Sequence, residues 1–168
     1  CEESERLFGI PSKGWTGTKC LEPGEQIACE DITSEFMCDS ALKNFGIKCR
    51  GWGGNKCLKY KVDAHDIDHP GACESAPAKL GIQVLGWGGS KCLKKGDTCK
   101  DIATPGVCND AIRRLGLNCR GWGGSACLSP KDKCANITSE YLCRDANERF
   151  TGFNCTGWDS FLEQCIQR

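Results

Sequence analysis

Cysteine is the residue type of this chain with the clearest chemistry, because its sulfur can form disulfides or bind metal ions. The 168 residues include 16 cysteines, a fraction typical of a disulfide scaffold in an oxidising compartment. Zinc sites usually contain a short Cys-x-x-Cys pair, whereas the closest cysteines here, such as Cys92 and Cys99, are 7 residues apart. We therefore expect disulfide bonds, an extracellular (secreted) location, and neither a metal nor another cofactor.

The cysteines recur together with a Gly-Trp dipeptide. Successive tryptophans are separated by 35 to 37 residues, and self-similarity at a fixed period of this length indicates a repeat protein. We therefore predict five tandem repeats of about 35 residues. The predicted boundaries are 1–28 for a partial first repeat, 29–63 for the second, 64–98 for a divergent third with one disulfide, 99–133 for the fourth and 134–168 for the fifth.

A complete repeat has four cysteines, which we number first to fourth by position. The third repeat lacks both the first and the third cysteine, where Ala64 and Val84 stand instead. The chain begins at a second-position cysteine, and Ser12 occupies the third position of that repeat. Four cysteines allow three connectivities, and only bonds from first to third and from second to fourth leave every cysteine paired within its repeat. The predicted disulfides are Cys1–Cys20, Cys29–Cys49, Cys38–Cys57, Cys73–Cys92, Cys99–Cys119, Cys108–Cys127, Cys134–Cys155 and Cys143–Cys165.

Each repeat has the pattern of a short helix followed by two extended arms. In the second repeat, Thr33 or Ser34 is a suitable helix N-cap. Apolar side chains recur at helical spacing over residues 35–45, and Gly46 is placed to end the helix. The segment 51–54 (Gly-Trp-Gly-Gly) is too rich in glycine for regular structure, so we expect a turn there. The predicted fold class is a small disulfide-rich α+β repeat protein, in which each repeat is a short helix plus extended arms around a Gly-Trp turn, stapled by one or two disulfides.

The third repeat departs from this pattern at Pro77, which falls where Leu42 and Ile112 lie in the second and fourth repeats. Proline inside a helix removes a hydrogen bond and clashes with the preceding turn. We therefore expect the helix of the third repeat to be shortened or kinked.

The tryptophans are the main candidates for ligand binding. An indole flanked by glycines and presented once per repeat suits stacking against a sugar ring, a peptide or another protein, and a row of them would bind a repeating ligand multivalently. The alternative is structural, because a thin core needs its aromatic residues and tryptophan is usually highly buried. The candidate ligand-binding residues are Trp15, Trp52, Trp87, Trp122, Trp158, Arg50 and Arg120.

The charges balance over the whole chain but not along it. There are 22 lysines and arginines and 22 aspartates and glutamates, so nucleic acid is not an expected partner. Residues 99–133 have an excess of basic side chains, whereas residues 134–168 have an excess of acidic ones. The basic set forms either an ordinary solvated surface or a patch for an anionic polysaccharide or an acidic protein. Its residues are Lys100, Arg113, Arg114, Arg120, Lys131 and Lys133.

Both histidines lie in one segment, residues 64–69. On a helix, His65 and His69 would share a face and could hold a metal with one carboxylate. However, Pro70 follows, and the Asp-Ile pair of this segment recurs in neighbouring repeats, so we expect a loop that leads into a helix cap. The recurring pair, which is Asn-Ile in the fifth repeat, has a structural interpretation: its polar side chain bonds nearby backbone N–H groups and its isoleucine supplies core.

Two segments match the N-glycosylation pattern, with Asn136 and Asn154 as acceptors. Asn154 is the less favourable of the two, because a bridged cysteine follows it. No apolar run approaches the roughly 20 residues that a membrane-spanning helix needs. We therefore expect a glycoprotein without a membrane span.

The sequence contains no convincing catalytic arrangement. There is no readable serine–histidine–acid spacing, and every cysteine is expected to be paired, so we do not expect an enzyme. We expect a secreted, non-enzymatic repeat protein that acts as a multivalent binding module for a carbohydrate or protein ligand. The alternative is a self-assembling structural protein of an extracellular coat, matrix or filament, because head-to-tail contacts that do not close generate filaments.

Overall fold

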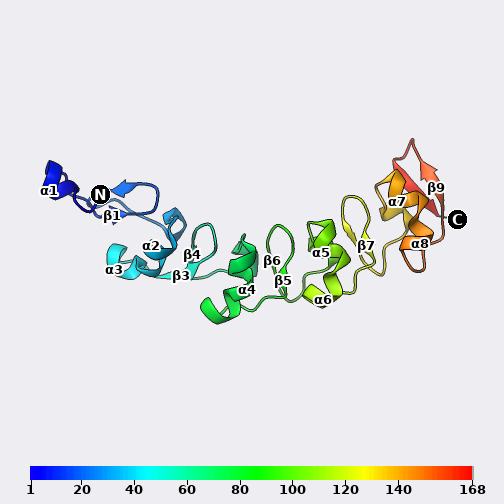
Figure 1. The fold of residues 1–168 in the computed structure, drawn as a ribbon, viewed down its shortest axis with the longest axis horizontal. Helices are drawn as coiled ribbons and strands as arrows, with labels where there is room; N and C mark the ends of the chain where they lie inside the picture. The colour runs from blue at the N-terminus through cyan, green and yellow to red at the C-terminus, as the bar shows by residue number, and fades with distance from the viewer. Residues whose placement is uncertain (168) are drawn as a thin grey trace. The chain divides into compact units, whose positions relative to one another are not determined.

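The computed structural model describes residues 1–167 and consists of short helices that alternate with two-stranded antiparallel sheets (Figure 1). The chain divides into two compact units, Cys1–Val84 and Leu85–Arg168. It is a small disulfide-rich α+β protein with a repeated pattern of elements, which confirms this part of the prediction. No helix of the described chain is long and apolar enough to cross a membrane.

The secondary-structure elements are short. The α-helices are α1 (Ser4–Phe8), α2 (Glu35–Asp39), α3 (Ala41–Phe45), α4 (Pro70–Lys79), α5 (Pro105–Asn109), α6 (Ala111–Leu115), α7 (Glu140–Arg144) and α8 (Ala146–Arg149). The 3-10 helices are η1 (Cys29–Asp31), η2 (Ala64–Asp66), η3 (Cys99–Asp101) and η4 (Cys134–Asn136). The strands, paired in chain order as hairpins, are β1 (Gly14–Trp15), β2 (Cys20–Leu21), β3 (Cys49–Trp52), β4 (Cys57–Lys59), β5 (Gly86–Trp87), β6 (Cys92–Leu93), β7 (Gly121–Trp122), β8 (Cys127–Leu128), β9 (Cys155–Asp159) and β10 (Gln164–Gln167).

The expected single helix is divided into two short helices in the second, fourth and fifth repeats. The breaks lie at Ser40, Asp110 and Asp145, where ψ is 9°, 19° and 5°. Serine and aspartate are poor in helix interiors because their side chains compete for backbone hydrogen bonds. The predicted ends are confirmed: Ser34 is the N-cap of α2, and Gly46 ends α3 in the left-handed conformation. The prediction of one continuous helix is wrong for these three repeats.

The third repeat shows the reverse, because its helix α4 runs through Pro77 without a break. The expectation that Pro77 shortens this helix is wrong, since α4 contains 10 residues and is the longest helix of the described chain. The alternative expectation of a kink at Pro77 stays a prediction. Pro77 corresponds to Leu42 and Ile112, which lie in the first turns of α3 and α6. In α4 this position lies inside the helix instead, where proline has no N–H to donate to the preceding turn. Ser75 of the third repeat corresponds to the break residues Ser40 and Asp110. The helix is not broken at Ser75, and its hydroxyl donates to the Gly71 carbonyl at 3.0 Å.

The Gly-Trp dipeptide lies in a strand, and the turn follows it. In the second repeat it ends β3, where Trp52 pairs with Cys57. The turn after it is closed by a hydrogen bond of 2.9 Å from Gly53 N–H to the Lys56 carbonyl. Gly51 has a φ of 141°, which glycine adopts readily and other residues do not. The expectation that this glycine-rich segment lacks regular structure is therefore wrong for Gly51 and Trp52, whereas Gly53 and Gly54 lie outside the strand.

All 16 cysteines are disulfide-bonded. In the second repeat, one bridge joins η1 to the start of β3, and the other joins α2 to β4. A helix, a 3-10 helix and a hairpin are thus held together covalently without a large core. The structure contains the bonds Cys1–Cys20, Cys29–Cys49, Cys38–Cys57, Cys99–Cys119, Cys108–Cys127, Cys134–Cys155 and Cys143–Cys165, and Cys73 and Cys92 are also bonded.

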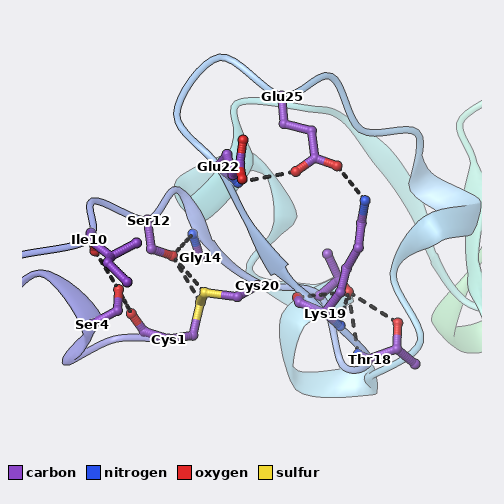
Figure 2. The surroundings of a disulfide bond; sticks show 11 residues. Cys1, Ser4, Ile10, Ser12, Gly14, Thr18, Lys19, Cys20, Glu22 and Glu25 are labelled. Carbon is purple, nitrogen blue, oxygen red and sulfur yellow. Dashed lines mark hydrogen bonds and ion pairs between the residues drawn. A yellow bond between two sulfur atoms is a disulfide. The ribbon is translucent and has the colours of Figure 1, made fainter. Parts of the chain in front are cut away.

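Ser12, which stands at the third cysteine position of the first repeat, lies against the remaining bridge of that repeat (Figure 2). Its Oγ is 2.9 Å from Cys1 Sγ and 3.0 Å from Cys20 Sγ. In the fourth repeat, the sulfurs of the first, third and fourth cysteines lie within 4.8 Å of one another, so the two bridges of that repeat are in contact. The serine hydroxyl therefore takes the place of the missing sulfur, as the alignment of the repeats predicts.

Each apolar core combines residues from two consecutive repeats. Leu21, which follows the fourth cysteine of the first repeat, is fully buried in one cluster with Ile32 of the second. Leu128 joins the core of the fifth repeat in the same way. A hydrogen bond of 3.0 Å from Thr33 N–H to the Thr16 carbonyl also connects two repeats. Within each compact unit, consecutive repeats are therefore packed together.

The recurring Asp-Ile pair has the structural role expected from the sequence. Asp31 Oδ2 accepts a hydrogen bond of 2.9 Å from Ala28 N–H, and Asn136 Oδ1 accepts one of 2.8 Å from Lys133 N–H. Aspartate and asparagine thus close the same 3-10 turn. The isoleucines that follow are almost completely buried, and they are Ile32, Ile67, Ile102 and Ile137.

Candidate functional site

The five tryptophans are neither fully buried nor separate from the core. Trp52, Trp87, Trp122 and Trp158 are half-buried, and Trp15 is 41% exposed. Trp52 and Trp122 each pack against the apolar core of their own repeat. In these two repeats, part of the indole therefore covers core and part stays accessible.

An open groove lies beside three of these tryptophans, and the same repeat positions line it each time. Its volume is about 290 Å³ at Trp15, about 480 Å³ at Trp52 and about 360 Å³ at Trp122. Small-ligand sites begin at about this size. The recurring positions are occupied by Glu2, Lys13, Met37 and Asn44 at Trp15, by Asp39, Arg50, Ala72 and Lys79 at Trp52, and by Asn109, Arg120, Leu142 and Arg149 at Trp122.

Each groove forms where the hairpin of one repeat packs against the helix of the next. A Cβ on Gly51 would come within 2.6 Å of Leu80 Cδ2, and one on Gly121 within 3.1 Å of Phe150 Cε1. In the first four repeats, the glycine before the tryptophan therefore lets an apolar residue at the C-terminal end of the next helix touch the strand backbone. The indole and this helix then line the same groove.

Arg50 lines the Trp52 groove and also has a structural role. Its Nε donates to the Leu80 carbonyl at 2.7 Å, and its Nη2 donates to the Gly81 carbonyl at 3.2 Å. These carbonyls lie at the C-terminal end of α4, where a cation is favourable. Arg50 thus joins the second hairpin to the third-repeat helix, and only part of its donor capacity remains for a ligand.

The equivalent residue Arg120 is held by an aromatic ring, a kind of contact that Arg50 also makes with Tyr60, at 5.9 Å. Its guanidinium lies over Phe153, 4.7 Å from the ring centroid. Arg149, at the end of α8, lies over Tyr141 at 5.6 Å. Among residues 1–167, neither guanidinium forms an ion pair with a carboxylate. Cation–π contacts restrict both groups while leaving their N–H donors free.

The three grooves share an indole but differ in charge. The Trp15 groove is lined by one lysine and two glutamates. The Trp52 groove has an arginine and a lysine together with two carboxylates. The described residues that line the Trp122 groove include two arginines and no carboxylate. The aromatic group is thus constant, whereas the charge changes from negative to balanced to positive.

The sequence prediction missed the groove residues that the following repeat supplies. Asn44, Lys79 and Arg149 each precede the apolar residue that packs on the glycine of the previous hairpin. The available signal was that glycine, because a glycine within a strand often marks the close approach of another segment. At Trp87 and Trp158, the basic residue two positions earlier is replaced by Leu85 and Thr156.

The basic residues of the fourth repeat are partly compensated. Arg113 and Arg114 both pair with Asp110, and the Arg114 Nε to Asp110 Oδ2 distance is 2.9 Å. Hydrogen bonds from Arg113 and then from Arg114 lower the pKa of Asp110 to about 2. These two guanidiniums are therefore engaged within their own helix, unlike Arg120 in the groove.

The remaining motifs have structural roles. His69 is the N-cap of α4, and its Nδ1 accepts a hydrogen bond of 3.2 Å from Gly71 N–H. His65 lies in η2, so the segment leads into a helix cap as expected. Within residues 1–167, one group of sulfurs is close enough to share a metal, and it consists of three disulfide-bonded cysteines of the fourth repeat. A bonded sulfur offers no thiolate for a metal.

Comparisons of the chain with protein-family models, with curated protein sequences and with solved structures find no match. The fold defines a class, which is a small disulfide-rich α+β protein built from repeated units. Because a fold alone does not imply a function, the function has to be inferred from the chemistry of the grooves.

Proposed function

We propose that this protein is a secreted, non-enzymatic binding module that holds carbohydrate in its repeated tryptophan grooves. The proposal depends mainly on the recurrence of one groove, lined by the same repeat positions, beside Trp15, Trp52 and Trp122. A tryptophan that only covers core needs no such groove. Repetition of the groove along the chain matches a ligand that is itself a repeating polymer.

The groove residues suit the two kinds of surface on a sugar ring. The C–H face of a sugar packs on an aromatic ring, whereas its hydroxyls need donors and acceptors in fixed positions. Each groove combines an indole with a carboxylate or amide and with a basic side chain. These polar residues are Glu2 and Lys13, Asp39 and Arg50, and Asn109 and Arg120.

A peptide ligand fits the grooves less well. Peptides commonly add a strand to an exposed sheet edge or place an amphipathic helix in an apolar groove. The strands that carry Trp15 and Trp122 contain 2 residues each, which is too short for strand addition. The grooves are also lined by charged or amide side chains rather than by apolar ones alone. Carbohydrate is therefore the ligand class that we propose.

Several weak grooves on one chain would together bind a polysaccharide firmly. Once one groove is occupied, the next sugar binds intramolecularly, and the overall affinity can exceed that of a single site by about 10²–10⁴. Disulfides such as Cys38–Cys57 limit movement within the repeats, so less conformational freedom is lost on binding.

The test is titration of the full chain with a panel of soluble oligosaccharides, observed by NMR through the indole N–H signals. We expect the signals of Trp15, Trp52 and Trp122 to shift more than those of Trp87 and Trp158. Trp52→Ala should weaken binding at that groove by about tenfold, because a stacking contact is lost.

The matched control is Phe161→Ser, which changes an aromatic side chain that is 94% exposed and does not line any of the three grooves. It should leave the affinity unchanged. If no saccharide shifts any indole signal, the carbohydrate proposal is wrong. If peptides from a library shift the indole N–H signals and no saccharide does, the ligand is a protein and not a carbohydrate.

We also propose that first-to-third and second-to-fourth bonds are the native pairing in every repeat, including a bond between Cys73 and Cys92. The bridges of the second repeat support this pairing, and a chain with this many disulfides suits an extracellular location. Peptide mapping without reduction tests the pairing, and a peptide that links Cys29 to Cys38 would contradict it.

N-glycosylation at Asn136 and Asn154 is a further part of this proposal. Both side chains are exposed. Asn136 uses its Oδ1 to accept the Lys133 N–H, which leaves Nδ2, the atom that carries a glycan, outside this hydrogen bond. Glycopeptide mass spectrometry of protein secreted from eukaryotic cells tests both sites, and unmodified peptides at both would contradict the proposal.

Self-assembly is the second candidate function, and exposed apolar side chains favour it. Phe161 and Leu162, in the turn of the last hairpin, are 94% and 57% exposed. Phe8 on α1 is 73% exposed, although the equivalent residue of the second repeat, Phe45, is 6% exposed. Apolar groups of this kind can mediate contacts between copies of the chain.

A further inference from the structure

The Trp122 groove differs from its equivalents because its charged and amide side chains present donors without a free acceptor. We infer that this groove selects an acidic saccharide, meaning a sugar that carries a carboxylate or sulfate group. The equivalent Trp52 groove has balanced charge and takes a neutral sugar. The inference rests on the proposed carbohydrate-binding function and adds the charge of the ligand to it.

The positive charge of this groove has no counterpart within the described chain. Arg120 and Arg149 line it, and neither is paired with a carboxylate among residues 1–167. Asp110, an acidic residue of the same repeat, is already bonded to Arg113 and Arg114. Charge complementarity therefore requires an anion from outside the protein.

Both guanidiniums are restrained before any ligand arrives. The Arg120 guanidinium lies 4.7 Å from the centroid of Phe153, and that of Arg149 lies 5.6 Å from the centroid of Tyr141. A planar guanidinium can donate two parallel hydrogen bonds to a carboxylate or a sulfate. Aromatic contacts that fix the plane reduce the entropy lost when these bonds form.

The third polar residue of the groove adds a donor. Asn109 uses its Oδ1 to accept the N–H of Trp122 at 3.3 Å, so the free group of this amide is its NH₂. The other side chains that line the groove are apolar, namely Pro105, Leu142 and Phe150 beside the indole. Such a lining favours a ligand rich in acceptors, and an anionic sugar has more of these than a neutral one.

The Trp52 groove provides an internal comparison. Asp39 and Glu35 stand there in place of Asn109 and Pro105. Lys79 lies 4.0 Å from Glu35, and Arg50 donates to two backbone carbonyls at the end of α4. Its positive charges are therefore largely used within the protein, and its carboxylates would repel an anion.

The test compares an oligouronate with the same oligosaccharide after its carboxylates have been reduced to alcohols. The full chain is titrated with each, and the indole N–H signals of Trp122 and Trp52 report the two grooves separately. A sulfated oligosaccharide with the same backbone distinguishes sulfate from carboxylate. We expect the Trp122 groove to bind the acidic ligands about tenfold or more tightly than the reduced one, with a preference that declines as salt is added.

Variants assign this preference to the groove arginines. Arg149→Gln should lower the affinity of the Trp122 groove for the oligouronate about tenfold or more and leave the reduced ligand unaffected. Arg149→Lys should restore part of the loss, because it keeps the charge but not the planar fork. The matched control is Arg113→Gln, an exposed arginine of the fourth repeat that pairs with Asp110 and does not line the groove.

The outcomes separate this inference from the proposed function. Equal affinity of the Trp122 groove for the acidic and the reduced ligand, or unchanged affinity in Arg149→Gln, overturns the inference while carbohydrate binding stands. If none of the oligosaccharides shifts an indole signal, the proposed function is overturned as well. Tighter binding of a polyglutamate peptide than of the oligouronate at Trp122 also overturns the inference and identifies an acidic peptide as the ligand.

Discussion

The α-carbon of Gly54 lies against the side chain of His69, the N-cap of the helix in the next repeat. A Cβ built on Gly54 would be 2.1 Å from His69 Cβ and 3.3 Å from Ala72 Cβ. No side chain fits there unless the helix or the hairpin moves. The glycines that make the same contact with the start of a following helix are Gly17, Gly89 and Gly124.

Gly54→Ala should therefore destabilise the protein by at least about 2 kcal/mol, because a clash with His69 is added to an unfavourable φ. The φ of Gly54 is 108°. Denaturation with the disulfides intact measures the change. The control is Gly106→Ala, because Gly106 lies in α5 with nothing within 4 Å of a built Cβ. Alanine at position 106 should stabilise the protein by about 0.5–1 kcal/mol. Equal effects of the two substitutions on the free energy of unfolding would contradict the close contact between Gly54 and His69.

A complete repeat should tolerate loss of its first-to-third bridge. The third repeat has Ala64 and Val84 at these positions, and Ala64 is buried at the start of η2. The double variant Cys99→Ala/Cys119→Val should keep its circular dichroism spectrum and lose about 3 kcal/mol of stability, as for a loop of this length. The single variant Cys99→Ala leaves a free thiol and should form mixed disulfides. Loss of the helical signal in the double variant would show that the repeats are not equivalent.

The ion pairs of Asp110 should make a small contribution to stability that depends on pH. The pKa of this carboxyl is lowered from 3.8 to about 2 by the hydrogen bonds from Arg113 and Arg114. Because the folded pKa is the lower one, the contribution is complete above about pH 4 and disappears as the pH falls through 2. Asp110→Asn should thus lower the melting temperature at pH 6 and have a much smaller effect at pH 2, where the carboxyl is about half protonated. If the melting temperatures of the variant and the parent protein differ by the same amount at pH 6 and at pH 2, the ion pairs of Asp110 are not the cause of the difference.

The exposed apolar turn of the last hairpin should control any self-association. Light scattering at increasing concentration measures it, with Phe161→Ser as the test variant, since Phe161 is 94% exposed. If copies of the chain associate through this turn, the variant should stay monomeric at concentrations where the molar mass of the parent protein increases. The control is Tyr60→Ser, which changes an exposed aromatic residue outside the turn. A parent that is monomeric throughout would remove self-assembly as a function.

Several features that act within one repeat could be predicted from the sequence. The cysteine spacing, the N-cap Ser34 and the terminal Gly46 each depend on residues close by in the chain. Aligning the repeats places Ser12 at the third cysteine position, and the structure shows its hydroxyl beside the Cys1–Cys20 bridge. Such local constraints are visible in sequence because covalent bonds and caps join residues at regular separations.

A groove residue supplied by the following repeat was missed, and so was backbone geometry within the helices. Arg149 lines the groove of Trp122, although nothing near Arg149 in the sequence indicates it. The helix break at Asp110 was also hidden, because the helical spacing of apolar residues continues across it. The shortening expected at Pro77 was also wrong, because α4 continues through this residue. Packing and backbone geometry decide these cases, and periodicity does not report them.

The contact between each hairpin and the next helix has a consequence for how genes of this kind can change in length. Its glycine and helix positions recur with the repeat, so duplication or deletion of one repeat length, from any starting point, leaves a junction with the same contact. A reading frame can therefore gain or lose whole repeats in one genetic event without a new interface having to evolve. The number of tryptophan grooves that one molecule carries can then change by recombination rather than by the slow accumulation of point mutations.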